Sequence, residues 1–235
     1  KLPIGTRFSA LVHNKYFILI LLSSLFLAVY QTVNGTCATY YAQYILGNNE
    51  YYSVLNLAEN IPQVIVIMIL APFIKKFGKR NLVLWGAVIT VVAQLLLLVV
   101  PANPTFAAVV AAIRGIGKAP LFGCVFTMMA DVVNYGHWKT GVRVQALIFS
   151  AATVGQKFGG GVAGAVVGWL MDASGFTGLQ EEIPSAVAMV ENLYIWGTVL
   201  AWAVIIVLMV AYKLDRQYNG MIKDMEQKGM LKQAD

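Results

Sequence analysis

The chain has 235 residues, of which 59% are hydrophobic and 12% are charged, and its formal net charge is +6. Because about a quarter of the residues of a soluble domain are charged, this composition excludes an ordinary soluble protein and indicates a membrane protein. The basic residues occur in short segments between apolar runs, so the net positive charge does not indicate a nucleic-acid partner. Cys37 and Cys124 lie inside apolar runs and predict neither a disulfide framework nor a metal site.

The apolar runs predict six membrane-spanning helices. They cover residues 16–46, 52–74, 82–100, 105–133, 143–171 and 192–212. A closed β-barrel is not expected, because the runs are continuous rather than alternating. The first, fourth and fifth runs exceed the bilayer thickness, so tilt, extension or kinks at Pro62 and Pro120 are expected.

Residues 1–15 are expected to form a cytoplasmic lead-in, 16–213 the six-helix bundle and 214–235 a cytoplasmic tail. An apolar stripe in the tail predicts either a short amphipathic helix on the inner membrane face or a solvated tail; its members are Tyr218, Met221, Ile222 and Met225. The chain begins at Lys1 and not at an initiator methionine, which suggests a processed or partial chain.

The Lys and Arg residues predict the orientation. They occur in the lead-in, at residues 75–80, at residues 139–143 and in the tail, whereas the alternate segments 47–51, 101–104 and 172–191 contain none. Because positively charged loops stay in the cytoplasm, we expect both termini to be cytoplasmic. Segment 172–191 is acidic and rich in Gly and Pro, which predicts a flexible outer loop.

The fifth run carries Lys157 near its middle. Thr153 lies one turn before this lysine, and Gly161, Gly164 and Gly168 continue the same helical stripe. A lysine at the bilayer centre costs at least about 3 kcal/mol, so it should face a cavity or a partner. The glycines are expected to let neighbouring backbones approach closely.

Three of the 17 Lys and Arg residues lie inside predicted spans and away from the span ends: Arg114, Lys118 and Lys157. Glu59 is the one carboxylate clearly inserted in a span, since Asp131 lies at a span end. This imbalance predicts a water-filled cavity, an anionic substrate or carboxylates from elements outside this chain. In the structural alternative, Arg114 pairs with Glu59 and holds two helices together.

The outer half of the first span is unusually polar, and Gln31 and Asn34 are its main amides. Amides, hydroxyls and tyrosine faces at membrane depth suit a polyhydroxylated solute. Interhelical hydrogen bonds are an equally good explanation of the two amides. Interfacial anchoring is the better explanation of Tyr44, Tyr51 and Tyr52.

The segment ADVVNYGHWKTGVR at residues 130–143 resembles the cytoplasmic loop between helices ten and eleven of the glycoside–pentoside–hexuronide:cation symporters. The lysine-bearing span that follows, KKFGKR at 75–80 and YKLDRQY at 212–218 are similar to the same family. The resemblance covers essentially the whole chain and matches the C-terminal half of such a transporter. It implies an all-α membrane protein of the bacterial inner membrane, with six transmembrane helices that form the C-terminal bundle of a major-facilitator fold.

The resemblance also implies a function. The expected activity is symport of a glycoside, oligosaccharide or hexuronide with Na⁺ or H⁺, by alternating access, with the sugar bound between two bundles. The partners would be the lipid bilayer, the sugar and an N-terminal six-helix half that this chain lacks. No cofactor and no metal site are expected here, because the coupling cation would be bound mainly by that other half.

By position in the motif, Lys157 resembles the family's lysine that couples the cation and sugar sites, and Thr153 resembles a sugar contact one turn away. Phe122 stands where a tryptophan is expected. Ala152 replaces a polar amide, which argues against melibiose as the substrate.

Asp131 and Arg143 match a charged pair that ties the cytoplasmic ends of the helices together. Arg114 and Lys118 fall outside the pattern of the melibiose-transporting members of the family, and our hypothesis is that they favour a substrate with a carboxylate, such as a glucuronide. The predicted substrate-binding residues are therefore Lys157, Thr153, Phe122, Gln31, Asn34, Arg114 and Lys118. The predicted coupling and gating residues are Lys157, Asp131, Arg143 and Glu59.

Alternatives are a carrier of lipid-like molecules with the same fold, and a six-helix channel or scaffold. An intramembrane serine protease would need a serine and a histidine at the same depth. His13 and His137 lie in cytoplasmic segments, far along the helix axis from Ser24 and Ser150, so no catalytic residues and no enzyme activity are expected.

Overall fold

The computed structural model describes residues 11–179 and 182–230, and this part of the chain consists of helices and connecting segments, without strands. Apolar runs of this length become helices in lipid because a helix satisfies its own backbone hydrogen bonds. The elements are α2 (Lys15–Tyr44), α3 (Tyr51–Phe77), α4 (Lys79–Leu96), α5 (Pro104–Thr140), α6 (Gln145–Ala173), α7 (Pro184–Asn192), the π-helix η1 (Leu193–Gly197), α8 (Thr198–Ala211) and α9 (Leu214–Gln227).

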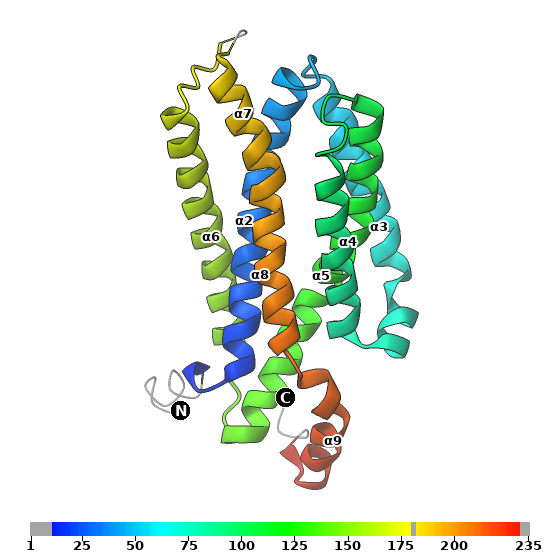
Figure 1. The fold of residues 1–235 in the computed structure, drawn as a ribbon. Coiled ribbons are helices and arrows are strands. Elements are labelled where there is room, and N and C mark those ends of the chain that lie inside the picture. The colour runs from blue at the N-terminus through cyan, green and yellow to red at the C-terminus, as the bar shows by residue number, and fades with distance from the viewer. Residues whose placement is uncertain (1–10, 180–181, 231–235) are drawn as a thin grey trace.

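The long helices form two packed groups (Figure 1). In one group α2 packs against α6 and α8, and in the other α5 packs against α3 and α4. Contacts of α4 with α8 and of α2 with α3 and α5 join the groups. The helix α9 lies at the end where α2 begins, and α7 lies at the opposite end. The prediction of an all-α bundle is confirmed.

Five helical segments are long and apolar enough to cross a membrane: Lys15–Tyr44, Tyr51–Phe77, Lys79–Leu96, Pro104–Thr140 and Pro184–Ala211. The sixth predicted span corresponds to α6, which has 29 residues and packs along α2. It falls outside this set on composition, since Gln156, Lys157 and its glycines lower its mean hydropathy. Its length matches that of a spanning helix, and its assignment as the sixth span stays a prediction.

Two predicted boundaries need correction. The helix α5 continues to Thr140, seven residues beyond the predicted end, and stops where Gly141 adopts φ of 68°. The last span begins at Pro184, because α7, η1 and α8 follow one another without a break. The predicted outer loop 172–191 is therefore partly helical. Pro62 and Pro120 both lie inside continuous helices.

Glycines on α4 and α5 permit a close approach of these helices. A Cβ on Gly86 would lie 2.2 Å from the Gly117 carbonyl oxygen. Gly159 permits a similar close approach of α6 to α2, since a Cβ on this residue would lie 2.6 Å from the Leu25 carbonyl oxygen.

The glycines of the Lys157 stripe behave differently from our expectation. A Cβ on Gly161 or Gly168 would meet nothing within 4 Å, and one on Gly164 would meet only Thr32 Cγ2 at 3.8 Å. These three glycines therefore line open space on the described part of the chain, and the close packing of α6 uses other positions.

The tail segment is helical over α9, and the apolar side chains of Leu214, Met221 and Met225 are buried in the protein core. Trp138 Nε1 donates to Asp224 Oδ2 at 2.6 Å, which ties α9 to the end of α5. The helix is thus held by the protein itself. The division into lead-in, bundle and tail, and a placement of α9 on the membrane face, stay predictions.

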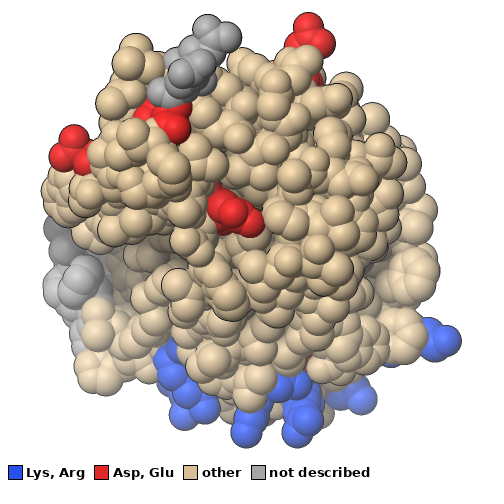
Figure 2. Space-filling view, turned by 45° about the horizontal axis from the view of Figure 1, so that its top comes forward, with Lys and Arg blue, Asp and Glu red and all other residues tan. Residues whose placement is uncertain are grey.

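The charged residues separate along the molecule (Figure 2). On the face shown, Asp and Glu occur toward the α7 end, and Lys and Arg gather at the opposite edge. Between these ends, exposed side chains such as Met68, Val92 and Trp169 are large and apolar. This is the pattern of a helix bundle whose sides face lipid.

Candidate functional site

A buried ionic network is centred on Glu59 of α3. Its Oε2 atom accepts from Arg114 Nη2 at 2.5 Å, and its Oε1 atom lies 2.7 Å from Lys118 Nζ. From α2, the Tyr30 hydroxyl donates to Oε1 at 2.5 Å, and Asn34 Nδ2 donates to Oε2 at 3.3 Å. All four partners satisfy a carboxylate that is only 4% exposed.

Arg114 extends this network to the other helices. Its Nη1 donates to Gln94 Oε1 of α4 at 2.6 Å, and its Nη2 donates to the Tyr194 hydroxyl of η1 at 3.1 Å. Gln94 Nε2 in turn donates to the Tyr194 carbonyl at 2.8 Å. The network therefore joins α2, α3, α4, α5 and η1, so one buried arginine fixes several helices.

The ion pair between Arg114 and Glu59, which was the structural alternative in the sequence analysis, is therefore present. Lys118 shares the same carboxylate. One carboxylate faces two cations, so the network keeps an excess positive charge. The helix geometry explains the arrangement, since Arg114 and Lys118 are i and i+4 on one face of α5. Helices α3 and α5 can come into close contact because Gly115 of α5 has no side chain. A Cβ there would lie 2.0 Å from the Glu59 carbonyl oxygen of α3.

Beside the network lies a hollow of about 250 Å³ that we call the amide hollow. Its walls carry five side-chain amides from α2 and α3: Gln31, Asn34, Asn56, Asn60 and Gln63. Glu59 and Lys118 also line it, as does Phe122, whose ring centroid is 5.6 Å from Lys118 Nζ. Arg114, at 1% exposure, lies behind this wall. Five predicted site residues therefore meet at one hollow: Gln31, Asn34, Glu59, Lys118 and Phe122.

Lys157 and Thr153 lie elsewhere, on an exposed face of α6. The Thr153 hydroxyl donates to the Phe149 carbonyl of its own helix at 3.0 Å. Within the described residues Lys157 has no hydrogen bond and no ion pair. The structure does not bring these two residues to the amide hollow, and Lys157 presents an uncompensated charge on a helix of spanning length.

The expected pairing of Asp131 with Arg143 needs correction. Asp131 is paired with Lys79 of α4, with 2.5 Å between Nζ and Oδ2, and Arg143 Nη2 donates to Gln145 Oε1 at 3.1 Å. The Asp131–Lys79 pair ties α5 to the start of α4, because Lys79 is the first residue of α4. Asp215 strengthens the same junction, since its carboxylate accepts from the Arg80 backbone N–H at 2.8 Å.

The tyrosine of α9 belongs to this junction as well. The Tyr218 hydroxyl accepts from Asn134 Nδ2 at 3.1 Å, and Lys79 Nζ lies 5.5 Å from its ring centroid. Burial and the nearby negative charge of Asp131 raise the pKa of Tyr218. Its hydroxyl therefore stays protonated at neutral pH.

Helices of spanning length, a buried ionic network and a polar hollow between helices are features that carrier bundles share. The sequence model of the family described as MFS/sugar transport protein matches residues 1–216. The chain belongs to this family.

Individual members of the family give more detail. The chain is 27% identical over 234 residues to the isoprimeverose transporter of Lactiplantibacillus pentosus. The matched region covers 97% of the chain and 48% of that transporter. It is 26% identical over 179 residues to the glucuronide carrier protein homolog of Escherichia coli, with 75% of the chain and 39% of the carrier covered. A raffinose carrier protein of Pediococcus pentosaceus is 27% identical over 171 residues.

The chain spans about half the length of the curated relatives that it matches. Membership in this family of transport proteins agrees with the expectation that the chain is not an enzyme.

Several residues of the network and of the amide hollow were not predicted. Asn56, Asn60 and Gln63 lie at i, i+4 and i+7 on the face of α3 that carries Glu59, so helical spacing from Glu59 could have identified them. Gln94 and Tyr194 offered no such signal. Tyr194 reaches Arg114 from a π-helix, and π-helical turns, although common at functional sites, have no sequence signature.

Proposed function

We propose that this chain is the C-terminal bundle of a secondary sugar carrier that works by symport with Na⁺ or H⁺. The observations that carry the proposal are the amide hollow and, separately, the exposed Lys157, both on helices of spanning length. In lipid such polar groups would be costly. The cost is removed when these polar groups contact water, a hydroxylated solute or a second bundle instead of lipid.

The relatives support a sugar as the solute, since those described above are named for isoprimeverose, a glucuronide and raffinose. Amides such as Gln31 and Asn60 both donate and accept hydrogen bonds, which suits sugar hydroxyls. The missing half of the relatives' length would provide the facing bundle and most of the cation site. Lys157 would face that bundle and couple cation binding to sugar binding, with Thr153 as a sugar contact.

We further propose that the substrate has a carboxylate, as a hexuronide does. The Glu59 network supports this, because Arg114 and Lys118 together exceed the single carboxylate by one charge. Lys118 is the cation that reaches the amide hollow, whereas Arg114 lies behind it. Lys118 would thus contact the substrate carboxylate, while Arg114 would hold the site together.

The separation of charge in Figure 2 supports a bacterial inner-membrane location with both termini in the cytoplasm. On this orientation the Asp131–Lys79 junction is cytoplasmic. Asp131 would then act in gating by keeping the inner ends of α4 and α5 together through Lys79. The partner of Arg143 is only two residues away, so Arg143 would not contribute to this tie. Accessibility of cysteines introduced at position 49 and at position 223 would test the orientation: reagent added from outside should label only position 49.

The first test is the mass of the native gene product, together with uptake by the complete product in proteoliposomes. Saturable uptake of a neutral glycoside or a hexuronide that follows a Na⁺ or H⁺ gradient is expected. A current that never saturates would instead indicate a channel. Failure to take up any sugar while lipid analogues are moved would overturn the sugar assignment.

The charge of the substrate is tested with Lys118→Met. This variant should lose uptake of methyl β-D-glucuronide by about tenfold or more, while uptake of methyl β-D-glucoside stays within twofold. Lys223→Met on the exposed side of α9 is the matched control and should change neither. Equal loss of both sugars would contradict the carboxylate proposal and leave the carrier proposal standing.

A further inference from the structure

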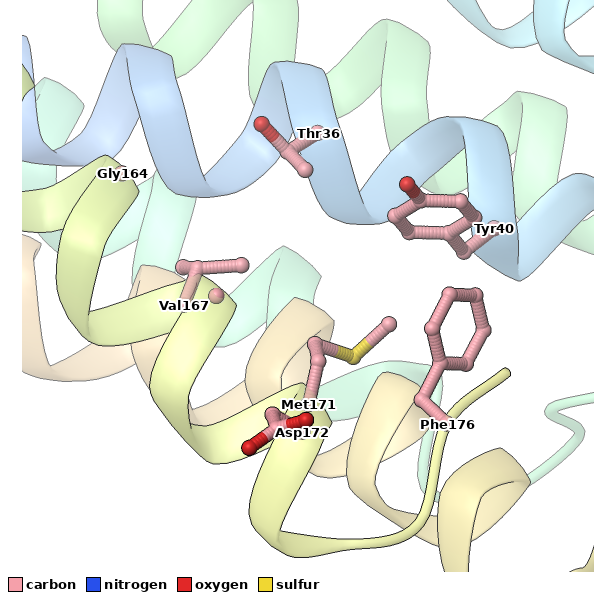
Figure 3. A pocket seen from close by; sticks show the side chains of 8 residues that line it. Thr36, Tyr40, Gly164, Val167, Met171, Asp172 and Phe176 are labelled. Atoms are coloured by element: carbon pink, nitrogen blue, oxygen red, sulfur yellow. The ribbon is translucent and has the colours of Figure 1, made fainter. Parts of the chain in front are cut away.

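A second hollow lies between α2 and α6 toward the α7 end of the bundle, with a volume of about 270 Å³ (Figure 3). We call it the aromatic hollow. Its lining residues include Thr36 and Tyr40 of α2, Gly164, Gly168 and Asp172 of α6, and Phe176 of the following segment. None of its lining residues is shared with the amide hollow.

Two aromatic rings form one side of this hollow. The Tyr40 and Phe176 ring centroids are 4.9 Å apart with an interplanar angle of 62°, and Figure 3 shows both rings at the same end of the hollow. The segment with Phe176 is anchored, since the Tyr44 hydroxyl donates to the Leu179 carbonyl at 2.9 Å. An anchored pair of rings offers a preformed apolar surface to the C–H face of a sugar ring.

Three polar groups line the same hollow without using their hydrogen-bonding capacity on the described residues. The Thr36 and Tyr40 hydroxyls and the Asp172 carboxylate make no hydrogen bond or ion pair there, although all three belong to the lining. Hydroxyls can donate and accept, and a carboxylate accepts. Together with the aromatic side, this is a combination that suits a hydroxylated ring. Because Asp172 is negative, an uncharged ring is favoured over an anionic one.

The space itself exists because two side chains are missing. A Cβ on Gly168 would meet nothing within 4 Å, and one on Gly164 would touch only Thr32. These glycines are therefore not required for the packing of α6 on α2, in contrast to Gly155 and Gly159, where a Cβ would lie 2.8 Å or less from α2.

The hollow is also separate from Lys157. All three α6 positions lie on one stripe, but Gly164 and Gly168 are about 10 Å and about 16 Å farther along the helix axis. We infer that the aromatic hollow is a second saccharide subsite, which binds an uncharged pyranose ring of a glycoside or oligosaccharide. This inference rests on the proposed sugar-carrier function and adds to it a position for a second ring.

The experiment measures binding of isoprimeverose and of methyl β-D-glucuronide to the complete gene product in lipid nanodiscs, by saturation-transfer NMR and competition. Gly168→Leu places a side chain in the open space of the hollow, and Tyr40→Leu removes one of its two aromatic rings. Each should weaken isoprimeverose binding by about tenfold and leave glucuronide binding within twofold. The matched control, Ala165→Leu, places the same leucine side chain at an exposed position of α6 outside the hollow and should change neither.

The outcomes separate the two proposals. If isoprimeverose binds the wild type and both hollow variants equally well, the second subsite is wrong and the carrier function is untouched. If the wild type binds no saccharide at all, the carrier function fails and the subsite with it. Asp172→Asn adds a further criterion: it should relax the discrimination against an anionic ring, and unchanged discrimination would contradict the role given to the carboxylate.

Discussion

Glu59 of α3 and Arg114 of α5 form a buried ion pair with 2.5 Å between Oε2 and Nη2, and Lys118 shares the same carboxylate. Desolvation makes such a network costly to build, yet breaking it is worse, because a charge is then left buried and unpaired. The Glu59 network therefore affects stability mainly through the free energy of unfolding that is lost when one of its charges is removed.

Glu59→Gln should destabilise the bundle by about 3–5 kcal/mol, because two cations lose their carboxylate. Thermal unfolding in nanodiscs, with the exposed Glu50→Gln as control, measures this. Replacement of all three charges in Glu59→Leu, Arg114→Leu, Lys118→Met should recover much of the loss, since no charge then remains buried. A triple variant no more stable than Glu59→Gln would show that the carboxylate stabilises by some other means.

Gly115→Ala should separate α3 from α5, because its Cβ would lie 2.0 Å from the Glu59 carbonyl oxygen. Overpacking of this kind costs about 1–3 kcal/mol, and a shift of α3 would also stretch the ion pair. Gly164→Ala is the matched control, since its Cβ meets only Thr32 at 3.8 Å. It should keep or slightly raise the unfolding temperature, owing to the better helix propensity of alanine. Equal effects of the two substitutions would argue against a tight contact at Gly115.

The sequence was sufficient for the fold and for part of the candidate site. Continuous apolar runs of bilayer length predict the helices, and the scarcity of charge inside them makes Glu59, Arg114 and Lys118 conspicuous. A single inserted carboxylate offered few alternatives, so the Glu59–Arg114 pair could be foreseen.

The partner of Asp131 could not be foreseen. Lys75, Lys76, Lys79, Lys139 and Arg143 are all expected at the same end of the bundle, and the choice among them depends on how α4 approaches α5. That approach is set by Gly86 against Gly117, a contact 31 positions apart in sequence that residue patterns alone do not specify. The resemblance suggested Arg143, whereas the packing selects Lys79.

Lys157→Ala should leave the stability of this chain within about 0.5 kcal/mol of the wild type, as expected for an exposed side chain without a partner among the described residues. Uptake by the complete carrier should nevertheless be lost, because the proposed role of Lys157 is toward the other bundle. The two readouts are needed together. Unfolding in nanodiscs and gradient-driven uptake are compared with Lys223→Ala, which should change neither. A large loss of stability would instead place Lys157 in the packing of the bundle.

The docking of α9 should depend on pH through Asp224. Hydrogen bonds from Lys228 and from Trp138 Nε1 lower the pKa of this carboxyl below its ordinary value. A group whose folded pKa is depressed stabilises the docked state above its unfolded pKa, about 3.9 for Asp. It loses that contribution as the pH falls through the folded pKa. Hydrogen exchange of residues 214–227 should therefore be slower in the wild type than in Asp224→Asn at pH 7, and the difference should shrink below about pH 4. Trp138→Phe removes one of the two donors, so its exchange rate at pH 7 should lie between those of the wild type and Asp224→Asn. A wild-type advantage that persists unchanged at pH 2 would show that the α9 contact does not depend on the ionised carboxylate.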